Sequence, residues 1–196
     1  MITHKQEKFM MIIMVTGFSA SLICMTLAMT LFPPDYSNEF PIYAPESNVI
    51  LQLGLALLIA ASTMMGIRLA ETEKIPAAGF TMLAISTGVM MAALFETTTV
   101  FTRESYEKQY YIITSSNFLY VPAMLMIAIY KEFKPWLRWM GIISTLPLMT
   151  VSFMFLFHYR NFTRLELIGT CGYFLIMITQ VLWAINVYSN YRKKII

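Results

Sequence analysis

Six long apolar runs, each close to the length that crosses a bilayer, constrain the fold of this chain most strongly. They cover residues 9–32, 49–67, 77–94, 111–130, 139–157 and 167–188. A transmembrane helix needs about 20 mostly apolar residues. A composition that is 58% hydrophobic and 13% charged would also leave a soluble domain coated with apolar surface. The sequence therefore predicts an all-α, polytopic membrane protein: a six-transmembrane-helix bundle forming a single domain over residues 1–196.

Basic residues mark the orientation of the predicted bundle, because they crowd into the termini and every second connector. These segments hold Lys5, Lys8, Arg68, Lys74, Lys131, Lys134, Arg138, Arg192, Lys193 and Lys194. The alternate connectors hold only Arg103, Lys108, Arg160 and Arg164. Cytoplasmic loops are enriched in Lys and Arg, so we expect both termini to be cytoplasmic. The net charge of +3 then reflects topology, and we expect no nucleic-acid partner.

Small residues and prolines suggest how the helices pack. Ala84, Gly88 and Ala92 recur at four-residue spacing in the third run, and small residues let membrane helices approach closely. We therefore expect this run to be central in the bundle. Pro122 and Pro147 lie inside the fourth and fifth runs, where a missing amide proton kinks a helix.

Polar side chains gather in the outer half of the predicted bundle. Thr114, Asn117 and Tyr120 follow one another at three-residue spacing, which places them on one helix face. Gln52 lies near the outer end of the second run. Polar groups in hydrocarbon need partners inside the bundle, so these residues predict a polar cavity that opens outward.

Two titratable residues lie at the ends of runs on the same side. Glu96 closes the third run and His158 closes the fifth. We interpret Glu96 as the only carboxylate beside a span interior, although solvation or a pair with Arg103 or Arg160 stays open. The tyrosines of the outer ends are interpreted as an interfacial aromatic belt. The expected ligand-binding residues are Gln52, Glu96, Asn117, Tyr120 and His158.

Several kinds of chemistry lack the residues they need. The only aspartate is Asp35, which excludes a protease with two buried aspartates, and no zinc or serine–histidine motif is present. A haem held by two histidines would need His4, which lies in the opposite tail from His158. We therefore predict no metal site, no cofactor and no assigned catalytic residue.

The first outer connector carries a resemblance to a known family. It is rich in prolines and aromatics and runs into Gln52 and Gly54; its residues are Pro33, Pro34, Tyr36, Phe40, Pro41, Tyr43 and Pro45. With six spans and both termini inside, the chain resembles the DRAM-like six-span membrane proteins. The serine-acid-glycine signature associated with that family's loop is missing, and Pro45, Glu46 and Ser47 come nearest to it. The resemblance implies membrane residence and lipid handling, with no residue roles.

Three functional interpretations follow from these features. The first is a non-enzymatic membrane protein whose outward cavity binds a small or lipidic ligand, or seats a partner membrane subunit or a second copy. The second is a proton- or ion-coupled small-molecule transporter that titrates Glu96 and uses the proline kinks as gates. The third is an intramembrane acid–base enzyme that uses Glu96 and His158.

Overall fold

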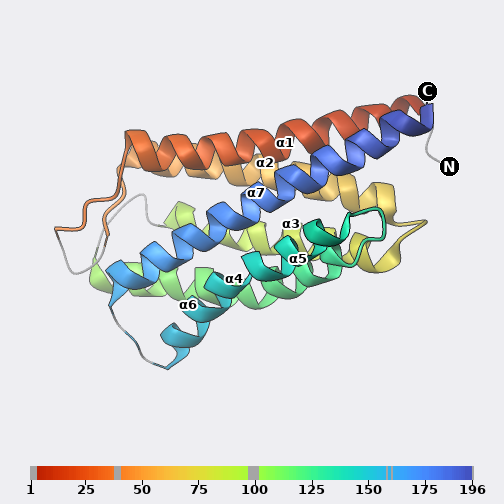
Figure 1. The fold of residues 1–196 in the computed structure, drawn as a ribbon. Coiled ribbons are helices and arrows are strands. Elements are labelled where there is room, and N and C mark those ends of the chain that lie inside the picture. Colours follow the sequence, from red (N-terminus) through yellow and green to blue (C-terminus); the bar gives the residue numbers. More distant parts are fainter. Residues whose placement is uncertain (1–3, 38–40, 97–101, 158, 160, 196) are drawn as a thin grey trace.

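In the part of the chain that the structure describes, seven α-helices form six candidate membrane spans (Figure 1). The computed structural model describes residues 4–37, 41–96, 102–157, 159 and 161–195. The helices are α1 (His4–Leu31), α2 (Pro45–Leu69), α3 (Lys74–Glu96), α4 (Arg103–Ala128), α5 (Pro135–Ser144), α6 (Leu146–Leu156) and α7 (Phe162–Ile195). Helices α5 and α6 together make one span of 22 residues. Every span is long and apolar enough to cross a bilayer, which confirms the predicted all-α, six-span membrane protein.

The spans form a ring in which the last helix closes on the first. Each of α1 to α4 packs against the next helix in the chain, α4 packs against both α5 and α6, and α7 packs against α5, α6 and α1. Among the described residues, the backbone of α3 comes close to α2 and α4, and its Phe80 ring meets Phe18 of α1. The predicted central position of α3 is wrong, because within this part of the chain it does not approach α5, α6 or α7. A Cβ built at Gly88 meets nothing within 4 Å, whereas one built at Gly79 lies 2.9 Å from the carbonyl oxygen of Ala123. The close approach of α3 to α4 therefore uses Gly79 and not the expected small face.

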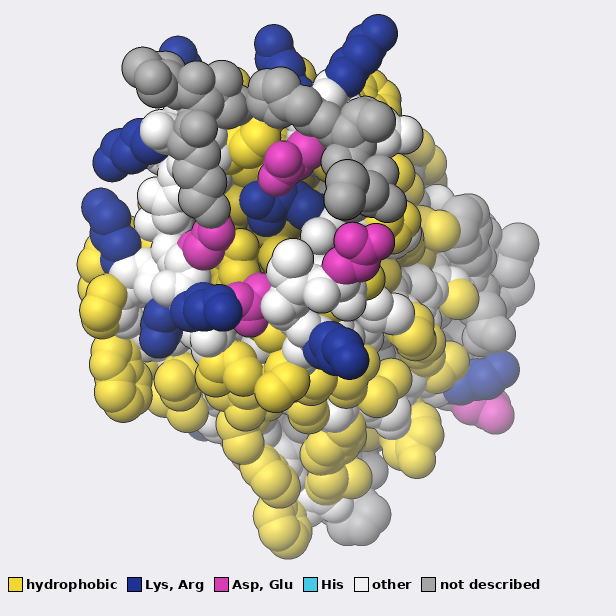
Figure 2. Space-filling model, turned by 90° about the vertical axis from the view of Figure 1, so that its right-hand side faces the viewer, with side chains coloured by type: hydrophobic (Ala, Val, Ile, Leu, Met, Phe, Trp, Pro, Cys, Tyr) yellow, Lys and Arg dark blue, Asp and Glu magenta, His cyan; other side chains and the backbone are white. Residues whose placement is uncertain are grey.

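Helix α1 begins and α7 ends at the same end of the bundle (Figure 1). Charged side chains of both signs gather on this end (Figure 2). Among the described residues, two ion pairs link segments at this end: Arg68 Nη2 lies 3.0 Å from Glu7 Oε1, and Lys131 Nζ lies 2.7 Å from Glu73 Oε1. The first pair joins α1 to α2, and the second joins the connector after α2 to the connector after α4. The side of the membrane that this end faces stays a prediction.

Prolines affect two spans differently. The fifth span breaks at Thr145, and Pro147 lies in the first turn of α6, where its missing N–H leaves no hydrogen bond unmade. The fourth span continues through Pro122 as one helix. The fifth span therefore shows the expected interruption, whereas the fourth shows no break.

The last span starts earlier than the apolar run predicts. Helix α7 begins at Phe162, and Phe162 and Leu165 of its first turn are buried in a cluster with Tyr106, Tyr110 and Phe155. This packing extends the helix past the apolar run, because helix ends are stabilised by burial as well as by hydrophobic length. As a consequence Glu166, one residue outside the predicted span, lies within a transmembrane helix.

Candidate functional site

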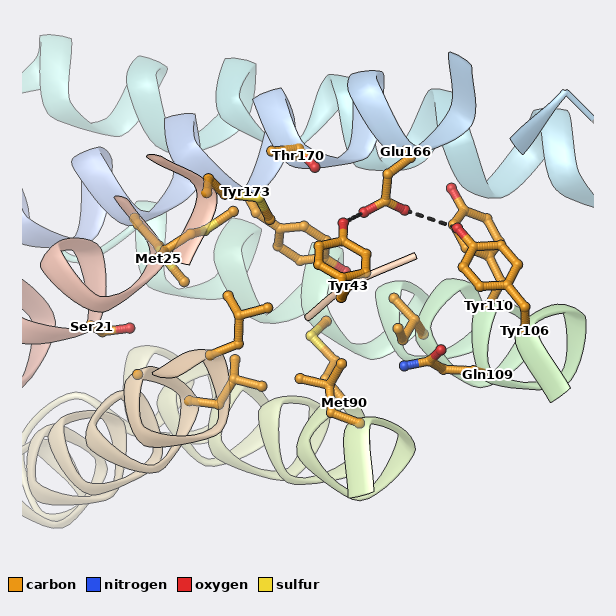
Figure 3. A pocket seen from close by; sticks show the side chains of 17 residues that line it. Ser21, Met25, Tyr43, Met90, Tyr106, Gln109, Tyr110, Glu166, Thr170 and Tyr173 are labelled. Carbon is orange, nitrogen blue, oxygen red and sulfur yellow. Dashed lines mark hydrogen bonds between the residues drawn. The ribbon is translucent and has the colours of Figure 1, made fainter. Parts of the chain in front are cut away.

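A cavity of about 120 Å³ lies inside the ring, beside the start of α7 and the connector between α1 and α2 (Figure 3). Both of these segments lie at the end of the bundle opposite the termini (Figure 1). Helices α1, α2, α3, α4 and α7 all contribute to its wall, and Tyr43 reaches it from the connector between α1 and α2. Most of the wall is apolar, with methionines from α1, α3 and α7. Because five of the six spans meet around it, the cavity belongs to the bundle as a whole and not to one pair of helices.

Glu166 is the only carboxylate among the described lining residues of the cavity. The hydroxyl of Tyr43 donates a short hydrogen bond to Glu166 Oε1, and the hydroxyl of Tyr106 donates to Oε2 at 3.3 Å. Figure 3 shows both phenols directed at the carboxyl group. Each carboxyl oxygen of Glu166 therefore accepts one hydrogen bond, and the two donors come from separate elements.

Local structure fixes the three partners of this hydrogen-bonded cluster. Thr102 caps α4 in a reciprocal capping box with Ser105, and this fixed start places Tyr106, Gln109, Tyr110 and Ile113 along the cavity wall at helical spacing. Asp35 and Ile42 exchange backbone hydrogen bonds of 2.9 and 3.0 Å, which holds the connector beside Tyr43.

The ring of Phe162 supports the same cluster from α7. It packs edge-on against Tyr106, with ring centroids 5.4 Å apart, and against Tyr110 at 5.8 Å. Asn161 Oδ1 accepts a hydrogen bond from the backbone N–H of Arg164 at 3.1 Å, which satisfies one free donor of the first turn. The start of α7, and with it Glu166, is therefore held in place by packing and by capping.

The electrostatics of the cavity are dominated by one acid among phenols. Its described lining residues include no Lys, Arg or His, so no positive side chain in this part of the chain compensates Glu166. Burial, and next the nearby Glu166 carboxyl, raise the pKa of Tyr43 well above its ordinary value. The phenol of Tyr43 therefore stays protonated and remains a hydrogen-bond donor at neutral pH.

The predicted polar stripe of α4 does face the interior. Thr114, Asn117 and Tyr120 are all buried. The hydroxyl of Tyr173 donates to Asn117 Oδ1 at 2.7 Å, and Asn117 Nδ2 donates to Ser152 Oγ at 3.1 Å. Tyr173 also lines the cavity, so it connects the wall to a hydrogen-bonded layer beneath it.

A second polar link lies one step deeper in the same interface. Gln180 Nε2 donates to the hydroxyl of Tyr120 at 3.1 Å, and the rings of Tyr120 and Tyr173 meet edge to face with centroids 6.1 Å apart. Side chains of α4 and α7 are thereby joined across the ring at several depths.

The described members of the expected ligand-binding set do not line the cavity. Gln52 is half-buried on α2, and its Nε2 is buried without a hydrogen-bond partner among the described residues. Glu96 ends α3, but its side chain lies outside the described part of the chain, as does His158. Asn117 and Tyr120 come together through Tyr173, and none of the described members of the predicted set forms the cavity wall.

Sequence reasoning missed the residue at the centre of the cavity. The statement that Glu96 alone adjoins a span interior is wrong, because Glu166 lies inside α7. Tyr43, Tyr106 and Tyr110 were interpreted as parts of an interfacial belt, but all three line the cavity. A signal was present: Glu166, Tyr173 and Gln180 repeat at seven-residue spacing, which puts them on one helix face.

Comparison of the chain with protein-family models, with curated proteins and with solved structures found no match.

Proposed function

We propose that this integral membrane protein binds a small or lipidic ligand in the cavity beside Glu166. The observation that carries this proposal is a cavity inside the helix ring, apolar along most of its wall, with one carboxyl group held by two phenols. Ligand sites are commonly concave and mostly apolar, with a few polar groups that orient the ligand. An acid within a membrane span is costly and marks a functional site.

The size of the cavity limits what can enter it. A buried volume of about 150 Å³ takes a molecule the size of benzene, and the cavity here is about 120 Å³. Only a compact head or a short segment of a larger molecule fits inside. An amphiphile would therefore place its head by Glu166 and leave its chain among the helices or in the bilayer.

The basic residues at the opposite end support a position on the non-cytoplasmic side, with both termini in the cytoplasm. The resemblance to DRAM-like proteins supports lipid handling on architecture alone. The transporter and the enzyme interpretations depend on Glu96 and His158, whose side chains lie outside the described residues, and they stay predictions. Seating of a partner subunit stays a prediction as well.

A matched pair of tryptophan variants tests ligand binding. Leu55 lines the cavity, whereas Leu53 on the same helix is 55% exposed toward the lipid side. Native mass spectrometry of protein released from lipid nanodiscs should detect a retained small molecule in the wild type and in Leu53→Trp. Leu55→Trp should lose it, because the indole fills the cavity. Equal retention in both variants, or none in the wild type, would refute the proposal.

A further inference from the structure

We infer that the group bound beside Glu166 is a cation, an alkylammonium head carried on an apolar chain; this rests on the proposed ligand-binding function. Three observations carry it: an uncompensated carboxyl group, a wall of aromatic rings, and free acceptor capacity on the carboxyl oxygens.

The carboxyl group of Glu166 has no positively charged side chain beside it among the described residues that line the cavity. Among the described residues of the connectors at this end and of the first two turns of the helices that follow them, the cations are Arg103, Lys108 and Arg164, and all three side chains are exposed. Arg103 pairs with Glu107 at 3.1 Å. A carboxylate removed from water is strongly favoured by an opposite charge in contact with it. A ligand that brings a positive charge supplies what the described wall lacks, whereas an anionic head would be repelled.

Aromatic rings surround the carboxyl group. Tyr43, Tyr106, Tyr110 and Tyr173 all line the cavity, and Figure 3 shows them grouped around Glu166. The face of an aromatic ring attracts a cation, and sets of such rings are the usual recognition site for ammonium groups. The same phenols stabilise a ligand with a neutral hydroxyl group less, because Tyr43 and Tyr106 already donate their hydroxyl protons to Glu166.

Acceptor capacity remains on Glu166 for a ligand that donates hydrogen bonds. A carboxylate offers about four lone-pair sites, and the two phenols occupy one on each oxygen. An ammonium N–H can occupy the others. The apolar part of the wall includes Met25, Met90 and Met177. It suits the adjoining alkyl carbons of the ligand, because methionine adapts to irregular apolar groups.

Three probes of equal chain length separate charge from hydrophobicity: octylammonium, 1-octanol and octanoate. Each is titrated into the full-length protein in nanodiscs by equilibrium dialysis, with partition into empty nanodiscs subtracted. Octylamine is protonated at pH 7 because an alkylamine has a pKa near that of lysine, about 10.4. We expect saturable binding of octylammonium, at least roughly tenfold tighter than that of octanol, and no saturable binding of octanoate.

Two isosteric variants locate the effect. Glu166→Gln should weaken octylammonium binding at least roughly tenfold and leave octanol unchanged. Glu104→Gln removes the same charge from an exposed position in the first turn of α4, and it should change neither. Both variants are checked for a monodisperse elution profile and an unchanged unfolding temperature, and the ranking of the three probes on the wild type needs no variant at all.

The possible failures are distinguishable. Equal binding of octanol and octylammonium to the wild type, unchanged in Glu166→Gln, would overturn the cationic ligand and leave the binding cavity in place. Preference for octanoate would overturn the inference in the same way. If no probe binds saturably, and Leu55→Trp retains as much small molecule as the wild type, both the inference and the proposed function fail.

Discussion

The hydrogen bond between Tyr173 and Asn117 gives the sharpest test of how the cavity floor is built. Tyr173→Phe keeps the ring and its edge-to-face contact with Tyr120, and it removes only the 2.7 Å bond to Asn117 Oδ1. Hydrogen bonds between membrane helices contribute about 0.6 kcal/mol on average and up to about 1.7 kcal/mol. We expect Tyr173→Phe to lower the free energy of unfolding by an amount in that range.

Asn117→Ala should cost more, because it removes the bonds to both Tyr173 and Ser152. It also leaves a buried hydroxyl without its acceptor, so the expected loss is about 1–3 kcal/mol. When Asn117 is already Ala, Tyr173→Phe should lower the free energy of unfolding by less than it does in the wild type. The difference, which is the coupling energy of the two side chains, should be roughly 0.6–1.7 kcal/mol.

Reversible unfolding in mixed micelles of mild detergent and dodecyl sulfate, followed by far-UV circular dichroism, measures these free energies. Ser115→Ala serves as the control, because Ser115 is exposed on the same helix. A coupling indistinguishable from zero, or single-variant losses equal to that of Ser115→Ala, would refute the side-chain link between α4 and α7 through this bond.

Three further outcomes are expected. Gly141→Ala should lower the free energy of unfolding by about 1–3 kcal/mol through overpacking, because its Cβ would lie 2.3 Å from the ring of Trp183. A Cβ at Gly88 meets nothing within 4 Å, so Gly88→Ala should be neutral or stabilising in thermal unfolding. As the pH rises past about 10, the unfolded chain loses the Tyr43 proton that the folded chain keeps. The free energy of unfolding should therefore fall by up to about 1.4 kcal/mol per pH unit. In unfolding measured as a function of pH, Tyr43→Phe should remove this contribution to the slope. Terminal epitope tags should be digested by protease only from the cytoplasmic side of sealed vesicles, and digestion from the other side would invert the proposed topology.

The sequence was sufficient to predict the spans and the inward face of α4. Hydrophobic length is a property of contiguous residues, and the three-residue spacing of Thr114, Asn117 and Tyr120 is local to one helix. Both features are therefore readable without knowing which helix packs against which. The stripe's hydrogen-bond partners Tyr173 and Gln180 lie on α7. They reach α4 only because the helices close into a ring, and no local sequence pattern predicts which helices face each other in it.

The centre of the cavity was missed because its residues lie at boundaries. Glu166 immediately precedes the last apolar run. The helix extends past it because Phe162 and Leu165 pack in the aromatic cluster and Asn161 caps the first turn. Tyr43 and Tyr106 occur where an interfacial belt is also expected. Composition cannot distinguish a tyrosine that faces lipid headgroups from one that donates to a buried acid. That distinction depends on tertiary contacts.

The central claim is that the cavity beside Glu166 holds the head of a ligand. An experimental density map of the protein in lipid nanodiscs, prepared without added ligand, tests it most directly. We expect density inside the ring that does not belong to the chain, in contact with the carboxyl group of Glu166 and with the rings of Tyr106 and Tyr173. A ring interior filled by the protein's own side chains, with Glu166 turned away toward water, would contradict it.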